Sequence, residues 1–409
     1  MQPPRPGLLD ALAKRVVLQR LAAVADGELL LVDGDERHRF GSCSAALPRR
    51  VEIMIRDPRF YGDLLLGGSI GAGEAYMRGA WSTPDLTGLV RLFARNMDLL
   101  DGMEGGVARL AAPLRRILHA WRRNTRGGSR RNIAAHYDLG NEFFSLMLDE
   151  TLMYSSAIFT RPDMTLGEAQ VARLEVIAAK LALGPADHVL EIGTGWGGFA
   201  LYAASRHGCR VTTTTISRKQ YELARARIAA AGLGDRIEVL CADYRDLEGR
   251  YDKLVSIEMI EAVGHEYYDV FFERCNRLLK PDGAMLLQAI TIADHRYDRA
   301  RKSVDFIQRY IFPGGCIPSV SALSGSIARA TDMRIVQLQD IGAHYATTLR
   351  KWRENLSGNL ERVRALGYDD TFLRMWEFYL CYCEGGFLER TIGDVQMLLV
   401  RPQSRLALP

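Results

Sequence analysis

The chain has 409 residues, of which 48% are hydrophobic and 25% charged, and its formal net charge is +4. This length exceeds what one hydrophobic core usually supports, so we expect two domains. So small a net charge does not by itself indicate nucleic-acid binding, and we expect none. Seven scattered cysteines form no CxxC pair, which predicts a reducing compartment and no structural metal site.

The N-terminal segment does not match a targeting sequence. It reads MQPPRPGLLDALAKRVVLQRL, in which early prolines, Lys14 and Arg15 interrupt the apolar pattern. A signal peptide needs an apolar core, and a membrane-spanning helix needs roughly 20 apolar residues. We therefore expect a cytoplasmic protein whose membrane contact is peripheral.

Residues 1–112 mix helical and short strand patterns with many glycines, which predicts a small α+β domain without a catalytic constellation. Residues 113–131, PLRRILHAWRRNTRGGSRR, then carry seven arginines and no acid. This segment is either a solvated linker helix or a surface that meets anionic lipid headgroups, where each basic residue contributes about 1 kcal/mol. We place the main domain after it, at residues 132–409.

From about residue 165, predicted helices and strands alternate. A capping-box pattern at Thr165 and Glu168 begins a helix that stops at Gly184 and Pro185. Strands are predicted at 188–193, 210–217, 237–243, 253–259 and 284–292, and helices between them include 219–232 and 266–279. This alternation predicts an α/β fold with a doubly wound, mostly parallel sheet. We expect a last strand at 396–402 to close the edge of the sheet.

The alternation lapses over residues 293–333, and two helical segments at 347–366 and 369–383 follow. Their aromatic residues are Trp352, Tyr368, Phe372, Trp376, Phe378, Tyr379 and Tyr382. Insertions after the later strands of an α/β core usually build a lid or a substrate pocket. We therefore expect a helical, aromatic-rich insertion beside the functional site.

A glycine-rich loop, EIGTGWGG, lies between an apolar strand and a helix, so that the backbone can approach a nucleotide-like ligand closely. A dinucleotide would favour an acid at the end of the second strand, which reads TTTTIS, although Arg218 and Lys219 leave an NADP site open. Two acids favour S-adenosylmethionine instead. Glu191 ends the first strand and Asp243 follows the third, and a carboxylate attracts a sulfonium while repelling a pyrophosphate.

Four further motifs accompany the glycine loop: NIAAHYDLGNEFF (132–144), TISRKQ (215–220), SIEMIEAVGHEYYDVFFERC (256–275), and YIFPGGCIPS with IGAHYATTLRKW (310–319, 341–352). Together they resemble the cyclopropane-fatty-acyl-phospholipid synthase family, which includes the mycolic acid cyclopropane synthases. The resemblance implies a class I S-adenosylmethionine-dependent methyltransferase fold, Rossmann-like with seven strands. It also suggests a homodimer and peripheral association with the inner face of the cell membrane.

The activity that the resemblance implies is transfer of a one-carbon unit to the cis double bond of an unsaturated phospholipid acyl chain. The alkene attacks the sulfonium methyl group, which leaves a carbocation beside the new methyl. A base then removes a methyl proton, and a cyclopropane ring closes. Aromatic faces stabilise the cation, and the site has to exclude water.

The family motifs assign roles residue by residue. Cofactor contacts fall on Tyr137, Gly193, Gly195, Gly197, Thr215, Ser217, Gln220, Tyr244 and Ile257. Glu261 and Tyr345 are assigned to the reaction, whereas we expect the nearby Glu258 to face away from the site. A cysteine that family patterns often mark as an active-site residue falls on Cys383, with a packed helix thiol as the alternative.

Family members hold a bicarbonate ion as the base, among a cysteine, a glutamate, a histidine and a tyrosine. In this chain Ser156, within TLMYSSAIF, takes the place of the cysteine, and Gln288 that of the histidine. Serine and an amide can hydrogen-bond an anion, so bicarbonate in an altered cradle is one alternative. The other is loss of the ion, after which the cation loses a neighbouring chain proton and gives a methylene- or methyl-branched acid.

Two hypotheses of other classes also stay open. A small-molecule N- or O-methyltransferase would share the glycine loop and the fold. A non-catalytic lipid- or cofactor-binding protein would account for the two changed ion ligands.

The arginine-rich segment predicts a membrane contact. Neutral replacements of Arg122, Arg123, Arg130 and Arg131 should weaken binding to anionic vesicles, most visibly at low salt, because salt screens surface charges. Co-sedimentation with vesicles measures this. Equal binding of the variant and the unmodified protein would assign the segment to a linker.

Overall fold

The computed structural model describes residues 8–98 and 140–407. These residues form two compact units. Unit 1 comprises residues 8–98 together with 302–311 and 360–391, and unit 2 comprises the remainder. The chain therefore returns to unit 1 twice after leaving it. Two sequence predictions, the basic helix at 113–131 and the cofactor contact Tyr137, lie outside the described residues.

Unit 2 is built on a seven-stranded sheet with the strand order β10-β11-β9-β8-β5-β6-β7. Five strands run parallel: β5 (His188–Ile192), β6 (Arg210–Thr214), β7 (Ile237–Leu240), β8 (Tyr251–Ile257) and β9 (Leu279–Ile292). β11 (Ile392–Val400) is antiparallel to β9, and β10 (Arg334–Asp340) is antiparallel to β11. The predicted α/β fold with a mostly parallel sheet is confirmed.

The prediction that the last strand closes the sheet is wrong, because β11 lies inside the sheet and β10 forms the edge. β10 reads RIVQLQD, and most of its residues are exposed, including Ile335 and Leu338. An exposed edge strand carries little of the apolar pattern on which strand prediction depends. β10 therefore gave no clear signal in the sequence.

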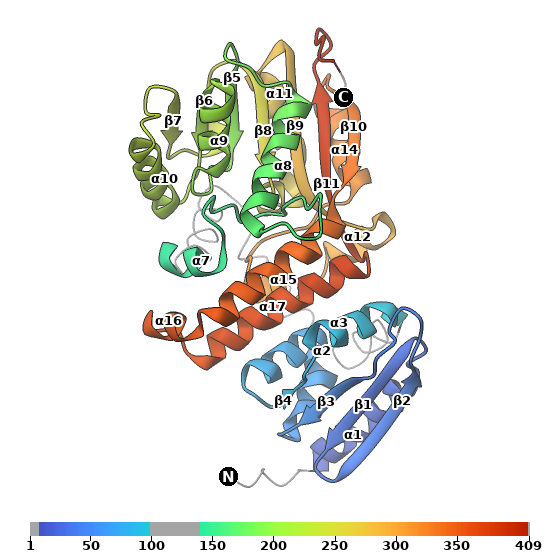
Figure 1. Cartoon of the computed structure of the whole chain (residues 1–409). Helices are drawn as coiled ribbons and strands as arrows, with labels where there is room; N and C mark the ends of the chain where they lie inside the picture. Colours follow the sequence, from blue (N-terminus) through green and yellow to red (C-terminus); the bar gives the residue numbers. More distant parts are fainter. Residues whose placement is uncertain (1–7, 99–139, 408–409) are drawn as a thin grey trace. The chain divides into compact units, whose positions relative to one another are not determined.

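Helices cover both faces of this sheet (Figure 1). On one face lie α8 (Leu166–Leu181), α9 (Gly198–His207) and α10 (Arg218–Ala230). On the other lie α11 (Tyr268–Leu278) and α14 (Val320–Ala330). Because side chains alternate along a strand, Leu286 of β9 packs toward α8 and α9, whereas Leu287 packs toward α11 and α14. The predicted capping box at the start of α8 is present, with Thr165 and Glu168 bonding reciprocally.

Three more helices complete unit 2: α7 (Asn141–Met147), α12 (Asp294–Ala300) and α15 (Gly342–Gly358). Short 3-10 turns at 244–246, 260–262 and 265–267 follow the ends of β7 and β8. α15 packs against α7 and against β11. Loops and helix starts therefore gather where the parallel strands end, which is the usual position of a ligand site in such sheets.

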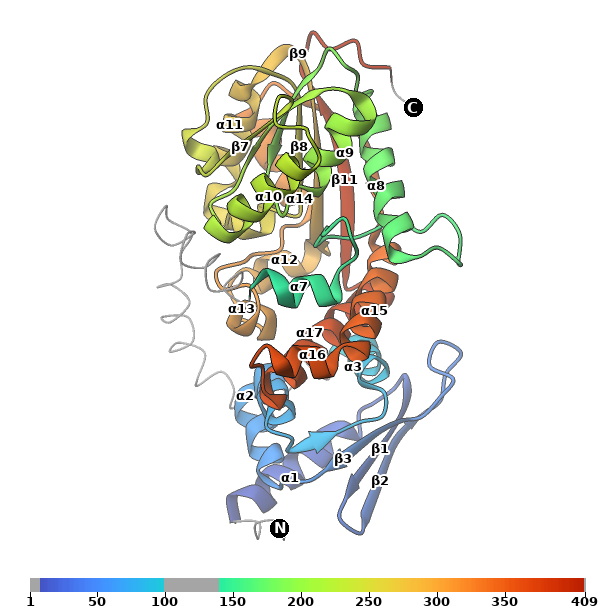
Figure 2. The same ribbon diagram turned by 60° about the vertical axis from the view of Figure 1, so that its left-hand side comes forward.

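Unit 1 has a four-stranded sheet in the order β2-β1-β3-β4. Its strands are β1 (Gly27–Asp33), β2 (Glu36–Ser42), β3 (Val51–Ile55) and β4 (Trp81–Ser82). Its helices, all labelled in Figure 2, are α1 (Leu8–Leu21), α2 (Arg59–Met77), α3 (Leu86–Arg95), α13 (Phe306–Tyr310), α16 (Leu360–Ala365) and α17 (Asp370–Leu388). Among the helices of both units that the structure describes, none is long and apolar enough to cross a membrane.

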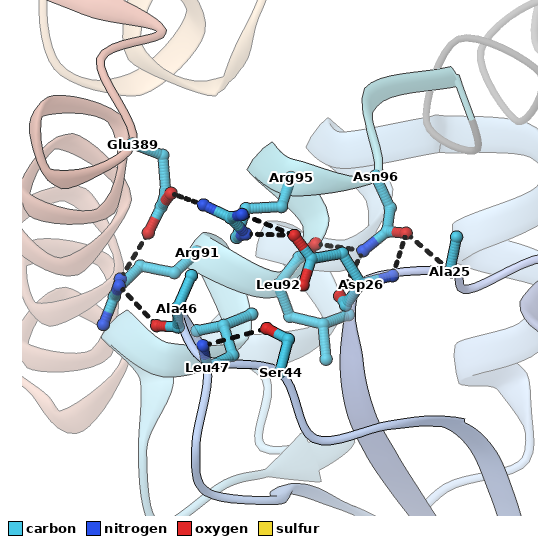
Figure 3. Close-up of polar contacts among 10 residues, drawn as sticks. All are labelled: Ala25, Asp26, Ser44, Ala46, Leu47, Arg91, Leu92, Arg95, Asn96 and Glu389. Carbon is cyan, nitrogen blue, oxygen red and sulfur yellow. Dashed lines mark hydrogen bonds and ion pairs between the residues drawn. The ribbon is translucent and has the colours of Figure 1, made fainter.

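Ion pairs join the end of the late helix α17 to α3, and an amide joins the end of α3 to the loop before β1 (Figure 3). Glu389, just after α17, accepts hydrogen bonds from Arg91 at 2.6 Å and from Arg95 at 2.8 Å. The side chain of Asn96 accepts bonds from two backbone N–H groups ahead of β1. Consequently most aromatic residues of the predicted insertion, from Tyr368 onward, belong to unit 1, while Trp352 belongs to unit 2.

Candidate functional site

The glycine-rich loop follows β5 at the carboxyl edge of the sheet. The φ angles of Gly193, Gly195 and Gly197 are +108°, +51° and +87°, a region that residues with a Cβ rarely adopt. A Cβ built on Gly195 would meet no atom within 4 Å, so the loop presents open backbone there. The backbone N–H of Gly193 and of Thr194 both donate to the Thr214 carbonyl, which fixes the loop to the end of β6.

Glu191 supports this loop from beneath. Its carboxyl group is buried and lies 2.6 Å from the Thr213 hydroxyl, which in turn lies 2.7 Å from the Thr194 hydroxyl. Burial raises the pKa of Glu191 to about 8, so the group is mostly protonated at neutral pH. Glu191 therefore holds the loop in shape through the hydroxyl groups of Thr213 and Thr194.

The predicted cofactor residues after β6 form one connected group. The hydroxyl of Thr215 donates to the Gln220 side-chain oxygen at 2.9 Å. Ser217 caps α10 by accepting a hydrogen bond from the Gln220 backbone N–H. This arrangement fixes the path of the chain beside the glycine loop.

The predicted residues after β7 and β8 lie along the same edge of the sheet. Arg245 forms two hydrogen bonds, of 2.8 and 2.6 Å, to the carboxylate of Asp243. The ring of Tyr244 packs edge-on against Phe271 at 5.4 Å. Ile257 is the last residue of β8. The structure thus brings the described cofactor candidates to one edge, and this arrangement fits an adenosyl cofactor.

The stretch TLMYSSAIF (151–159) contains no helix or strand and connects the glycine loop to a group of acids at the end of β8 and in β11. A Cβ on Gly198 would come within 2.4 Å of Met153, so this stretch packs closely on the loop. Ser156 is fully buried, and its backbone N–H donates to Glu258 at 2.8 Å. Its hydroxyl donates to the Ala157 carbonyl instead. The contact to the acid therefore comes from the backbone of Ser156.

Glu258 is the centre of the site, so the expectation that it faces away is wrong. Besides the bond from Ser156, its carboxylate accepts hydrogen bonds from Gln288 at 2.7 Å and from the Tyr345 hydroxyl at 2.6 Å. Its φ is +48°, a conformation that costs a residue other than glycine about 1–3 kcal/mol and that persists where the surrounding structure enforces it. Three of the four residues that the family motifs place around the ion contact this protein carboxylate.

Glu261 and Asp394 complete a group of three acids near Gln288, of which Asp394 is fully buried and the two glutamates are half-buried. Glu261 accepts one hydrogen bond, from the Ile290 backbone N–H, and its other oxygen is buried without a partner. Asp394 accepts a bond from Gln288 at 3.0 Å and also hydrogen-bonds Glu258. Burial raises the pKa of all three acids, that of Glu261 to about 8.

A buried guanidinium decides how charge is distributed over these acids. Arg173 of α8 is fully buried, bonds the Ser155 hydroxyl at 2.9 Å, and interacts favourably with Glu258 and Asp394. Three carboxylates near a single cation would repel one another, so neutral forms are favoured for some of them. Glu258 accepts the most hydrogen bonds, which stabilise its charged form. We therefore assign the negative charge to Glu258 and protons to Glu261 and Asp394.

Aromatic rings extend from Glu258 to the glycine loop. We call this set the aromatic cluster; its members are Phe144, Tyr154, Trp196, Phe312, Tyr345 and Trp352. Successive ring centroids lie between 4.9 and 6.2 Å apart. All six rings belong to unit 2. Such a wall excludes water and presents π faces that stabilise a cation.

Cys383 and the residues around Glu258 belong to different structural units. Cys383 belongs to α17 of unit 1, whereas Ser156, Glu261, Gln288 and Tyr345 belong to unit 2. Burial strongly raises the pKa of the Cys383 thiol, which keeps it in the poorly nucleophilic neutral form. These observations favour the packed-thiol alternative.

Comparison with known proteins identifies the family. Residues 124–397 match the mycolic acid cyclopropane synthetase family. The chain belongs to this family. It is 39% identical to the tuberculostearic acid methyltransferase of Mycobacterium tuberculosis over 399 residues, which cover 96% of this chain and 91% of that protein. It is 37% identical to the cyclopropane-fatty-acyl-phospholipid synthase of Escherichia coli, over 86% of this chain and 88% of that one.

Solved structures agree with this family assignment. The cyclopropane synthase MmaA2 of Mycobacterium tuberculosis has 31% identity and a TM-score of 0.62, covering 66% of this chain and 98% of its own. The mycolic acid cyclopropane synthase CmaA1, solved with S-adenosylhomocysteine (SAH), has 34% identity and the same TM-score and coverage. The chain described here is therefore an S-adenosylmethionine-dependent methyltransferase with the class I fold.

Bicarbonate, in contrast, does not fit this site. The Ser156 N–H, the Gln288 amide and the Tyr345 hydroxyl already donate to the Glu258 carboxylate. An added anion would have to displace that carboxylate, whose negative charge would also repel it. The sequence contained one signal that a protein carboxylate takes the place of the ion. This signal is Glu258, an acid directly after β8, which the sequence pattern alone predicted to face away from the site.

The raised pKa of Glu261 predicts how stability depends on pH. The folded protein holds this proton up to about pH 8, while an unfolded glutamate loses it near its ordinary pKa. Stability is therefore fully present at low pH and falls as pH rises toward 8. Glu261→Gln cannot ionise at position 261, so this loss of stability should not occur in the variant. Between pH 5 and pH 9 its free energy of unfolding should therefore increase by about 1.4 kcal/mol or more relative to the unmodified protein.

Urea unfolding at several pH values measures this difference. Asp163→Asn, which changes an exposed acid, is the matched control. Parallel stability curves for Glu261→Gln and the unmodified protein would contradict the assignment of the proton to Glu261.

Proposed function

We propose that this enzyme methylates the double bond of an unsaturated phospholipid acyl chain and that Glu258 replaces bicarbonate as the base. One observation carries the proposal. The carboxylate of Glu258 accepts the hydrogen bonds of Ser156, Gln288 and Tyr345 that the family motifs assign to the ion. Family membership and relatives that act on lipids support the substrate class.

The site residues divide the work of such a reaction. Bound S-adenosylmethionine would supply the electrophilic methyl group. The alkene electron pair forms the new carbon–carbon bond as the sulfur–methyl bond breaks and S-adenosylhomocysteine leaves. The aromatic cluster stabilises the cation left on the neighbouring carbon and keeps water away from it. Glu258 then removes one proton. Overall, the lipid gains one methyl group and loses one proton, and the Glu258 carboxylate accepts that proton.

The hydrogen bonds to Glu258 also bear on the product. Three donors stabilise the carboxylate and make it a weaker base than a bare buried carboxylate would be. Slower deprotonation gives a secondary cation time for a hydride to move from the methylated carbon to its neighbour, which yields a more stable tertiary cation. Loss of a methyl proton from that cation forms a methylene branch instead of a ring. We therefore propose a methylene-branched acyl chain as the main product.

The relatives support this choice of product. The tuberculostearic acid methyltransferase shares 39% identity over almost the entire chain, a longer match than that to the cyclopropane-fatty-acyl-phospholipid synthase. Replacement of the cysteine and histidine of the ion site by Ser156 and Gln288 agrees with a site that no longer holds an ion.

Analysis of lipids from a host rich in monounsaturated phospholipids tests the function. Cells that express the enzyme should contain acyl chains heavier by one CH₂, and gas chromatography with mass spectrometry should locate a methylene branch. Tyr345→Phe removes one donor from Glu258 and makes it a stronger base, so cells that express this variant should make a larger share of cyclopropane product. Unchanged lipids in both strains would refute the proposed function, and a cyclopropane ring would refute the proposed product.

A glycine at position 258 tests the role of Glu258. Glu258→Gly removes the carboxylate, relieves the left-handed backbone strain, and opens a space lined by the same three donors. We expect the methylation rate to fall by about 100-fold or more, as for loss of a general base. Added bicarbonate or formate should then restore part of the activity, because the ion can enter the vacated position.

The matched control is Glu258→Gln, which keeps the side-chain volume without the charge and should not respond to added ions. Transfer of labelled methyl groups to vesicles of unsaturated phosphatidylglycerol provides the assay. Full activity of Glu258→Gly in bicarbonate-free buffer would exclude Glu258 as the base.

A further inference from the structure

A row of three glutamines crosses the sheet beside the site. In the strand register, Gln288 of β9 pairs with Gln396 of β11, and Gln396 pairs with Gln339 of β10. Gln288 and Gln396 are buried, with 0% and 1% of their surface exposed. A buried amide is costly unless its polar atoms are bonded, so two adjacent buried glutamines require an arranged set of partners.

Lys180 of α8 is the hydrogen-bond donor at one end of this row of glutamines. Its ammonium donates to the side-chain oxygen of Gln396 at 2.7 Å and to that of Gln339 at 2.6 Å. Gln396 in turn donates through its amide nitrogen to the side-chain oxygen of Gln288 at 3.1 Å. Gln288 then donates to Glu258 and to Asp394. The hydrogen bonds therefore all run in one direction, from the lysine to the acids.

The direction of this chain is fixed at both ends, by Lys180 as a donor and by the Glu258 carboxylate as an acceptor. An amide can rotate by 180° and exchange its donor and acceptor ends, so a pair of glutamines alone has no fixed direction. An ammonium can only donate, so it fixes the oxygen of Gln396 toward itself and the nitrogen toward Gln288. Gln288 consequently has its oxygen occupied and its nitrogen directed at the acids. If Gln288 were reversed, its oxygen would face the Glu258 carboxylate and repel it.

We propose that Lys180 is a positioning residue for the reaction, which acts through Gln396 to hold Gln288 as a hydrogen-bond donor to Glu258. The inference rests on the proposed function, in which Glu258 is the base. A lysine whose only role was to fill space would not require hydrogen bonds to the side-chain oxygens of two paired glutamines. Lys180 touches no reacting atom, and its effect reaches the base through two side chains.

Substitutions at position 180 test this relay. Lys180→Met keeps the length and apolar stem while it removes the donor, and Lys180→Gln keeps a hydrogen-bonding group without a fixed direction. Both variants should lower kcat about tenfold, the order expected for one hydrogen bond to a charged group, with KM for both substrates unchanged. Lys180→Arg, which restores a donor-only cation, should recover most of the rate.

Gln339→Met is the matched control, because it removes the other partner of Lys180 and leaves the path to Gln288 intact. Its kcat should equal that of the unmodified enzyme. Gln396→Leu should lower kcat as Lys180→Met does, and the double variant should be no slower than either single variant, because both changes break the same path. Additive losses, or a normal kcat in both Lys180→Met and Lys180→Gln, would overturn the proposal.

A spectroscopic measurement separates this inference from the proposed function. With ¹⁵N-labelled glutamine side chains, the signal of Gln288 is assigned by its disappearance in Gln288→Leu. That signal should shift in Lys180→Met and Lys180→Gln and stay in place in Gln339→Met, whether or not a lipid is methylated. An unmoved signal in both Lys180 variants refutes the relay, whereas a moved signal without any lipid product refutes only the function.

Discussion

The burial of negative charge constrains the rest of this site. Asp394 is fully buried and Glu258 and Glu261 are half-buried, and the buried cation Arg173 interacts favourably with Glu258 and Asp394. Removing charged groups from water is expensive, so the fold can keep them only with protons, hydrogen bonds or a counter-charge. All three are present in unit 2. Raised pKa values favour protons on Glu261 and Asp394, neighbouring groups donate hydrogen bonds to Glu258, and Arg173 supplies a positive charge.

That constraint explains why the site draws on elements far apart in the chain. The loop before α8 supplies Ser156, the end of β8 supplies Glu258, β9 supplies Gln288, and α15 supplies Tyr345. Their common partner is one carboxylate, held in a strained backbone conformation that only a well-fixed surrounding structure maintains. In the proposed function, a protein carboxylate in this position is a permanent base, while a bound ion depends on its concentration. The same fixation limits how strong the base can be, which connects the geometry to the proposed product.

Unit 1 illustrates how chain order and spatial order diverge. The aromatic residues after Trp352 looked like a lid over the site because they follow the later strands in sequence. Glu389 pairs instead with Arg91 and Arg95, and α17 packs against α2 and α3. Local sequence predicts the helix correctly. It does not specify which core the apolar face of that helix joins, since this depends on complementary surfaces formed almost 300 residues earlier.

The sequence by itself determined the α/β alternation, the glycine loop and the family, because these depend on local periodicity and short motifs. It also located Ser156, Gln288 and Tyr345 as residues of interest. Only the tertiary structure decided that Glu258 meets all three, that β10 forms the sheet edge, and that Lys180 and Gln396 stand in line behind Gln288. Strand register and side-chain direction depend on long-range pairing, which no short stretch encodes. TLMYSSAIF shows this difference well: its serine marks the site, yet the group that contacts the base is the backbone N–H, which every residue except proline carries.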